Sequence, residues 1–231
     1  MELFRLCLVC QATMIFSDLR ICGVCSRAIQ TMSLKNTTTS EKSNFLFYWE
    51  APTSELILRL KGGRYPAETL WLGKALGLKF QSNVQNMNGG LPSIVAEITK
   101  KGGPLVVSAP PSGGLDGKRE TKRLDHAALL ATGVSLVTGG VFVKNAFFSK
   151  FQSGFQKDKG AFERRERQFN LGGGWGPSFG QTILTVDDVI TSGATMAAMR
   201  LAVRKEWGSA IQVIPLCLAF TPKLEHPPKC L

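Results

Sequence analysis

Two adjacent carboxylates, Asp187 and Asp188, stand inside the run Thr182-Ile-Leu-Thr-Val-Asp-Asp-Val-Ile-Thr-Ser-Gly-Ala-Thr195. The apolar residues before them favour a strand, and the residues from Met196 to Trp207 favour a helix. A strand, a short turn and a helix in this order place backbone N–H groups and a helix N-terminus where an anion can bind. Carboxylates beside such a cradle suggest a ligand that has both hydroxyls and a phosphate, such as a ribose 5-phosphate.

The candidate cradle is residues 191–195, Thr191, Ser192, Gly193, Ala194 and Thr195. Their amides can form a concave anion site, the hydroxyls add donors, and Gly193 permits a tight turn. Two neighbouring carboxylates at the end of an apolar strand would repel each other unless polar groups or a metal satisfied them. The structural alternative is a solvated turn in which Thr191 or Ser192 caps the following helix.

Four cysteines form a second candidate site. Cys7 and Cys10 are separated by two residues, eleven residues follow, and Cys22 and Cys25 repeat the same spacing. Each pair can direct both sulfurs to one ion, so the pattern predicts a closed, structural zinc site in a small ribbon-like module. The alternatives are a redox dithiol or unrelated buried cysteines. Cys217 stands in an apolar strand and is expected in the core.

Length and charge limit the class of protein. The chain has 231 residues and a net charge of +11, which predicts attraction to polyanions such as phosphorylated ligands or nucleic acid. The sequence has no run of about 18 apolar residues and no signal-peptide pattern at its start, so we expect a cytoplasmic protein without membrane insertion. Disulfides are not expected in that compartment.

Strand-like and helix-like segments alternate along the chain. We expect helices over 54–61, 67–78, 93–101, 118–131 and 196–207, and strands over 45–49, 104–109, within 133–143, at 182–188 and within 209–220. This alternation predicts an α/β fold, a mainly parallel sheet flanked by helices. We expect two parts, a zinc-binding module and linker over residues 1–44 and an α/β domain over 45–231.

The motif Val186-Asp-Asp-Val-Ile-Thr-Ser-Gly-Ala-Thr195 resembles the phosphoribosyl pyrophosphate motif of type I phosphoribosyltransferases. Together with the cysteine module, it is similar to the ComF family, which is associated with competence and DNA uptake. Further similar segments are Leu60-Lys-Gly-Gly63, Val106-Val-Ser-Ala-Pro-Pro111 and Leu129-Leu-Ala131. The segment Lys122-Arg-Leu-Asp-His126 departs from the arginine-glycine-aromatic-asparagine-glutamine that the family commonly has there.

The resemblance implies roles for the candidate residues. Asp187 and Asp188 would hold the ribose 2- and 3-hydroxyls, directly or through Mg²⁺, and residues 191–195 would hold the 5-phosphate. Carboxylates there can stabilise positive charge that builds on the ribose as pyrophosphate leaves. Hypoxanthine-type enzymes have an aspartate base where this chain has Thr191, so whether the protein transfers the phosphoribosyl group or only binds stays open.

The alternative from another class is a non-catalytic protein that binds single-stranded DNA or docks on a competence helicase. The segment Lys144–Arg167 is rich in lysine, arginine and phenylalanine. It can act as a lid over pyrophosphate, as a DNA-binding arm with stacking aromatics, or as a solvated loop. His126, beside Asp125 in a helical segment, is expected to be structural.

Overall fold

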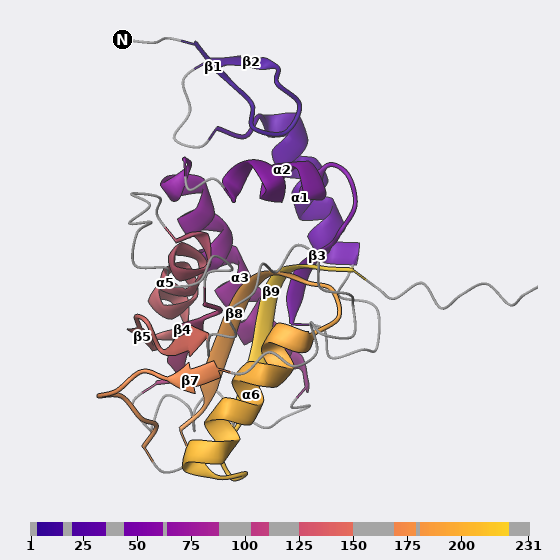
Figure 1. Ribbon diagram of the computed structural model, residues 1–231. Helices are drawn as coiled ribbons and strands as arrows, with labels where there is room; N and C mark the ends of the chain where they lie inside the picture. The colour runs from indigo at the N-terminus through magenta and orange to yellow at the C-terminus, as the bar shows by residue number, and fades with distance from the viewer. Residues whose placement is uncertain are drawn as a thin grey trace, which may run out of the picture.

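The computed structural model describes residues 4–15, 20–35, 44–61, 64–87, 103–110, 125–149, 169–178 and 181–221. Within them, a five-stranded sheet forms the centre of the molecule (Figure 1). Across the sheet, the strands are β3 (Phe45–Tyr48), β9 (Val213–Phe220), β8 (Ile183–Ile190), β4 (Leu105–Ser108) and β5 (Val141–Val143). All neighbours pair in parallel, which confirms the predicted α/β class.

Helices cover both faces of this sheet. Along β8, Leu184 packs in one hydrophobic cluster with α3 (Pro66–Met87) and α5 (His126–Thr138). The preceding residue, Ile183, packs in a second cluster with α6 (Ala194–Trp207). Successive side chains of a strand point to opposite faces, so a sheet buried on both sides needs apolar residues at consecutive positions. Leu105, Val106 and Val107 of β4 and Ile183 and Leu184 of β8 are consecutive buried apolar residues that meet that need.

The chain leaves the sheet in opposite directions from its two adjacent strands β4 and β8. From β4 the chain passes through α5 to β5 on the outer side, and from β8 it passes through α6 to β9 on the other side. The two helices lie in the two different clusters, hence on opposite faces. The carboxyl ends of β4 and β8 therefore form a topological switch point, where open α/β sheets leave a crevice for ligands.

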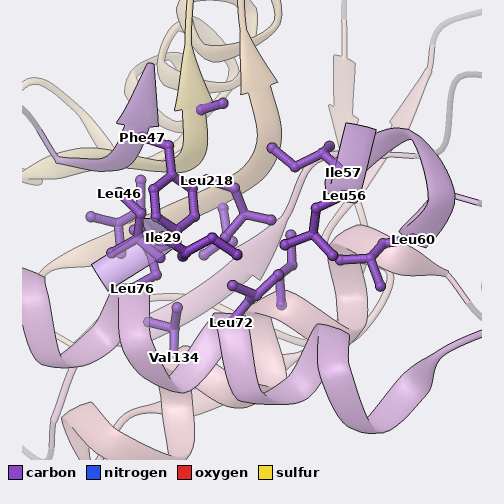
Figure 2. Close-up of a cluster of buried hydrophobic side chains, with 14 of the residues drawn as sticks. Ile29, Leu46, Phe47, Leu56, Ile57, Leu60, Leu72, Leu76, Val134 and Leu218 are labelled. Carbon is purple, nitrogen blue, oxygen red and sulfur yellow. The ribbon is translucent and has the colours of Figure 1, made fainter. Parts of the chain in front are cut away.

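The N-terminal elements join the α3 side of the core. They are β1 (Phe4–Leu6), β2 (Thr13–Ile15), α1 (Gly23–Lys35) and α2 (Thr53–Leu60). Figure 2 shows Ile29 of α1 and Leu56 of α2 converging on the cluster that also contains Phe47 and Leu72. Cys7 and Cys25 belong to the same cluster, so the cysteine module packs directly on the α/β core. The division into residues 1–44 and 45–231 stays a prediction.

Two helices end further along the chain than expected. The expected helix 67–78 runs on to Met87, because Phe80 and Val84 continue its buried face. In place of the expected helix 118–131, α5 begins at His126, after its N-cap Asp125, and continues through Gly133 to Thr138. That glycine does not break the helix because its missing side chain makes room for α3. The expected helix 93–101 lies outside the described residues, and α1 extends into the expected linker as far as Lys35.

A short antiparallel pair accompanies the main sheet. β6 (Phe147–Ser149) pairs with β7 (Phe169–Leu171), and Ser149 stands opposite Phe169. Trp175 and Trp207 pack in the same hydrophobic cluster as Phe147 and Phe169 of this strand pair. The ring centroids of the two tryptophans are 4.7 Å apart. Most of the candidate lid or arm 144–167 lies outside the described residues. None of the described helices has the length and apolar character that crossing a membrane requires.

The crossing of α3 and α5 provides a test of the fold. A Cβ added to Gly133 would lie 2.7 Å from the backbone nitrogen of Lys74, a contact that side-chain movement cannot relieve. We expect Gly133→Ala to lower the free energy of unfolding by ~1–3 kcal/mol, the range of overpacked cores. Urea unfolding followed by circular dichroism measures this change.

The control is Gly173→Ala, since a Cβ at Gly173 meets no atom within 4 Å. It should change stability by less than about 0.5 kcal/mol. Equal effects of the two substitutions would contradict the close helix crossing.

Candidate functional site

The four cysteines come together as the spacing predicted. The sulfurs of Cys7, Cys10, Cys22 and Cys25 all lie within 4.8 Å of one another, and Cys10 Sγ is 3.7 Å from Cys22 Sγ. Four sulfur donors in one tight group suit the tetrahedral coordination of zinc, and a purely thiolate set leaves no open position for a substrate. This group can hold a structural metal ion.

Local backbone geometry produces this cluster. The first knuckle closes through hydrogen bonds from Cys7 N to Ala12 O (2.9 Å) and from Gln11 N to Cys7 O (3.1 Å). Gln11 has a left-handed backbone (φ 62°), which turns the chain directly after Cys10. The second pair stands at the start of α1, where unpaired helix N–H groups favour negative sulfur.

The surroundings of one cysteine, Cys7, favour its thiolate form. Burial by itself would raise the pKa of the Cys7 thiol, but hydrogen bonds from the backbone N–H groups of Cys22, Cys10 and Val9 lower it to about 6. Burial and the neighbouring sulfurs raise the pKa of Cys25. Thiolate at Cys7 beside a less acidic Cys25 limits repulsion between the sulfurs, and a bound cation would favour thiolate at all four.

The carboxylate pair lies at the switch point of the sheet. β4 pairs with β8 as far as Val186, and its last contact is Ala109 N to Val186 O at 2.8 Å. On its other side, β8 pairs with β9 through Ile190. The expectation that the strand ends at the two aspartates is therefore wrong, because β9 is long enough to pair with two further residues. Asp187 and Asp188 stand just past the end of β4.

The environment of Asp187 disfavours the charged form of its carboxyl group. Burial, together with the negative charge of Asp188, raises its pKa from 3.8 to about 7. Its Oδ1 accepts a hydrogen bond from Asp188 N at 2.8 Å, which favours the charged form but does not outweigh burial. A carboxyl group with a pKa near 7, at the carboxyl end of a parallel sheet, is typical of functional sites.

Two side chains from other elements meet Asp188. Lys61 Nζ, at the C-cap of α2, lies 3.0 Å from Asp188 Oδ2, and His126 Nδ1, at the start of α5, lies 3.7 Å from the same oxygen. Burial lowers the pKa of His126, against the opposite influence of Asp188. The Lys61 side chain is 43% exposed, so its ammonium group is accessible to a dissolved anion as well as to Asp188.

Asp125 positions His126. Its Oδ1 accepts hydrogen bonds from Ala127 N (3.0 Å) and Ala128 N (3.3 Å), which makes it the N-cap of α5. His126 is only 8% exposed, and its Nε2 is buried without a hydrogen-bond partner among the described residues. The expectation of a structural His126 missed its contact with Asp188, since their separation in sequence gives no signal for it.

Of the predicted cradle, residues 191–193 form the turn from β8 into α6, and Ala194 and Thr195 are the first residues of the helix. Gly193, with φ 74°, is the N-cap of α6, so neither Thr191 nor Ser192 takes that position. The Ser192 hydroxyl accepts a 3.4 Å hydrogen bond from Ala194 N. No acidic residue stands in the first turn of α6, so the positive end of the helix is not neutralised there.

Sequence reasoning missed Lys61, Asp125 and His126 as neighbours of the carboxylates. Lys61 had one signal, because it stands in the Leu60-Lys-Gly-Gly63 segment that the resemblance includes. The site thus joins the end of α2 and the last residues of β8 with the starts of α5 and α6. No family model matches the chain, and no curated protein matches it.

The cysteine cluster predicts a metal content of about one zinc per chain. Cys22→Ser should reduce this content toward zero and destabilise the N-terminal part, because a serine hydroxyl is a poor zinc ligand. Inductively coupled plasma mass spectrometry of purified protein measures the stoichiometry. Cys217→Ala, at a buried cysteine of β9, is the control and should retain the metal. A disulfide within the cluster and substoichiometric metal would contradict the zinc site.

Asp187 should titrate near pH 7 in carbon-13 NMR of its carboxyl group. Folding raises its pKa above the ordinary 3.8, so it favours the neutral form. The stability that protonated Asp187 gives to the folded state is therefore fully present below about pH 4. It is lost as the pH rises through about 7. Asp187→Asn should remove that pH dependence, and Asp188→Asn should lower the Asp187 pKa by removing the neighbouring charge. A midpoint near 4 in the wild type would refute this assignment.

Proposed function

We propose that the protein is a ComF-like phosphoribosyltransferase-domain protein that binds phosphoribosyl pyrophosphate with Mg²⁺. The observation that carries this proposal is the place of the carboxylate pair. Asp187 and Asp188 stand at the switch point between β4 and β8, and two residues further on, after Ile190, residues 191–193 lead into the N-terminus of α6. Hydroxyl-binding carboxylates and a phosphate-binding turn are thus adjacent, at the edge where α/β sheets bind ligands.

The charges of the site fit the same ligand. Lys61 offers a cation on the α2 side of Asp188, and α6 offers its positive end on the other. A ribose with phosphates at both ends needs positive groups on two sides and acceptors for its hydroxyls between them. The +11 net charge of the chain adds long-range attraction for so anionic a ligand.

Magnesium fits the donor set, because carboxylate oxygens are hard ligands. When bound by Asp187 or Asp188, it would neutralise the pyrophosphate and hold it in place. In the proposed reaction, the carbon–oxygen bond between C1 of the ribose and pyrophosphate breaks, and an acceptor forms the new bond at C1. The protein's own carboxylates stabilise the positive charge on the ribose as this happens.

The acceptor side of the site determines whether turnover occurs. Thr191, where some relatives by resemblance have an aspartate base, is exposed and has no carboxylate. An acceptor that needs no strong base, such as ammonia, suits this site better than a purine. The proposed function is therefore binding of phosphoribosyl pyrophosphate, and transfer of the phosphoribosyl group is tested separately.

Isothermal titration calorimetry with phosphoribosyl pyrophosphate tests the proposal. Wild type should bind, and more tightly with Mg²⁺ than without it. Asp187→Asn/Asp188→Asn removes two charged acceptors, each worth ~1.5–3 kcal/mol, so affinity should fall roughly 100-fold or more. Glu206→Gln, at an exposed position in the last turn of α6, is the control for loss of one negative charge and should bind like wild type.

Absence of Mg²⁺-dependent binding in folded wild type would refute the proposed function. Release of pyrophosphate, measured with a set of acceptors, then separates an enzyme from a binding protein. Tight binding without product from any acceptor would leave a phosphoribosyl pyrophosphate-binding protein that does not catalyse transfer. Single-stranded DNA binding and docking on a competence helicase stay predictions, since most of Lys144–Arg167 lies outside the described residues.

A further inference from the structure

The cysteine module contacts the chain on both sides of the segment that begins at Lys61. On one side, the residue after Cys10, Gln11, meets Arg59 in the last turn of α2. On the other side, Arg20, two residues before Cys22, meets Tyr65 and Glu68 at the start of α3. The proposed anion-binding lysine is thus flanked in sequence by two contacts with the four-cysteine module.

The first contact joins Gln11 to Arg59. With its amide oxygen turned toward the guanidinium, Gln11 accepts hydrogen bonds from both Arg59 Nη1 and Nη2, the second at 3.0 Å. This orientation is assigned because the opposite one would place donors against donors. The left-handed turn at Gln11 belongs to the knuckle of Cys7 and Cys10, so its position depends on the geometry of those two sulfurs.

Arg59 is connected to the site through a rigid element. Leu56, Ile57 and Leu60 of the same helix are fully buried, and they lie in the cluster that contains Cys7 and Cys25 (Figure 2). The backbone N–H of Lys61 donates to Ile57 O at 3.0 Å, which continues the helical pattern to the lysine. Because α2 is packed and hydrogen-bonded over this length, a shift at Arg59 displaces Lys61 relative to Asp188.

The second contact starts from Arg20. Its carbonyl accepts a hydrogen bond from Leu8 N at 2.8 Å, which ties it to the first knuckle. Its own N–H donates to Glu68 Oε1 at 3.0 Å, and its guanidinium lies 5.6 Å from the ring centroid of Tyr65. Glu68 is 5% exposed, so this hydrogen bond to a buried carboxylate is costly to break.

We propose that metal binding at the four cysteines and ligand binding at Lys61 and Asp188 are coupled through these contacts, with Gln11 and Arg59 as positioning residues. The metal holds both knuckles in one arrangement, and the knuckles hold the ends of α2 and α3. The coupling to phosphoribosyl pyrophosphate rests on the proposed function. The coupling to the Lys61–Asp188 contact itself does not.

The test is calorimetry of zinc-loaded, full-length protein with phosphoribosyl pyrophosphate and Mg²⁺. Gln11→Ala and Arg59→Ala should each weaken binding about 5- to 20-fold, within the usual range of coupling between sites. Gln11→Glu keeps an acceptor for the guanidinium and should restore binding to the wild-type level. Arg204→Ala removes the same charge from the last turn of α6 and is the matched control.

Reciprocity distinguishes coupling from a general loss of stability. If ligand binding favours the metal-bound arrangement, saturating ligand must raise zinc affinity by the same factor by which zinc raises ligand affinity. Zinc affinity is measured by competition with a chelator, with and without ligand. In Arg59→Ala the ligand should change zinc affinity less than in the wild type, because one of the two contacts is lost, although the four cysteines still bind the metal. Unchanged ligand binding in Gln11→Ala and Arg59→Ala would overturn the proposal.

A second readout works without any ligand. The NMR signals of the Lys61 ammonium and the Asp188 carboxyl should shift on zinc removal and in Arg59→Ala, but not in Arg204→Ala. If wild type fails to bind phosphoribosyl pyrophosphate, the proposed function fails, and these signals still decide the coupling. Signals that stay unchanged on zinc removal would overturn it. Arg59→Lys, which keeps the charge but loses the bidentate contact, gives the same test if Arg59→Ala does not fold.

Discussion

The burial of strand β8 between two parallel neighbours and two helical layers is the constraint on which the rest of the structure depends. Ile183, Leu184 and Val186 are all fully buried, so no charged side chain can be placed among them without a large desolvation cost. Charged side chains can be accommodated only beyond the point where β4 stops pairing with β8. The two aspartates stand at that point, and the helices α5 and α6 diverge there to opposite faces.

The two neighbouring carboxylates have different surroundings. Asp187 stays close to the core and is half neutral near pH 7, since burial raises its pKa. Asp188 instead meets Lys61 and His126 from two other elements. The pair therefore consists of one carboxyl group with a pKa near 7 and one that forms an ion pair with a lysine. Acceptor oxygens and a cation thus lie side by side at the end of β4.

The cysteine module is part of the same arrangement. A module of this size buries little apolar surface by itself, and a metal ion is the usual way to hold such a short segment in one conformation. Here Cys7 and Cys25 lie in the main cluster, and the loops of the module meet α2 and α3 on either side of Lys61 in the sequence. The physical result is that the module can position a residue of the candidate site without contacting that site itself.

Local patterns in the sequence were enough to predict the α/β class, the four-sulfur group and the strand–turn–helix that carries Asp187 and Asp188. These features depend on residues close together in the chain, where periodicity, glycine and cysteine spacing act directly. The length of β8 beyond the aspartates and the passage of α5 through Gly133 required the packed structure, because a pairing partner and a crossing helix decided them. The meeting of Lys61, His126 and Asp188 was likewise determined only in the tertiary structure, since packing of α2 and α5 against the sheet brings together side chains that no local pattern connects.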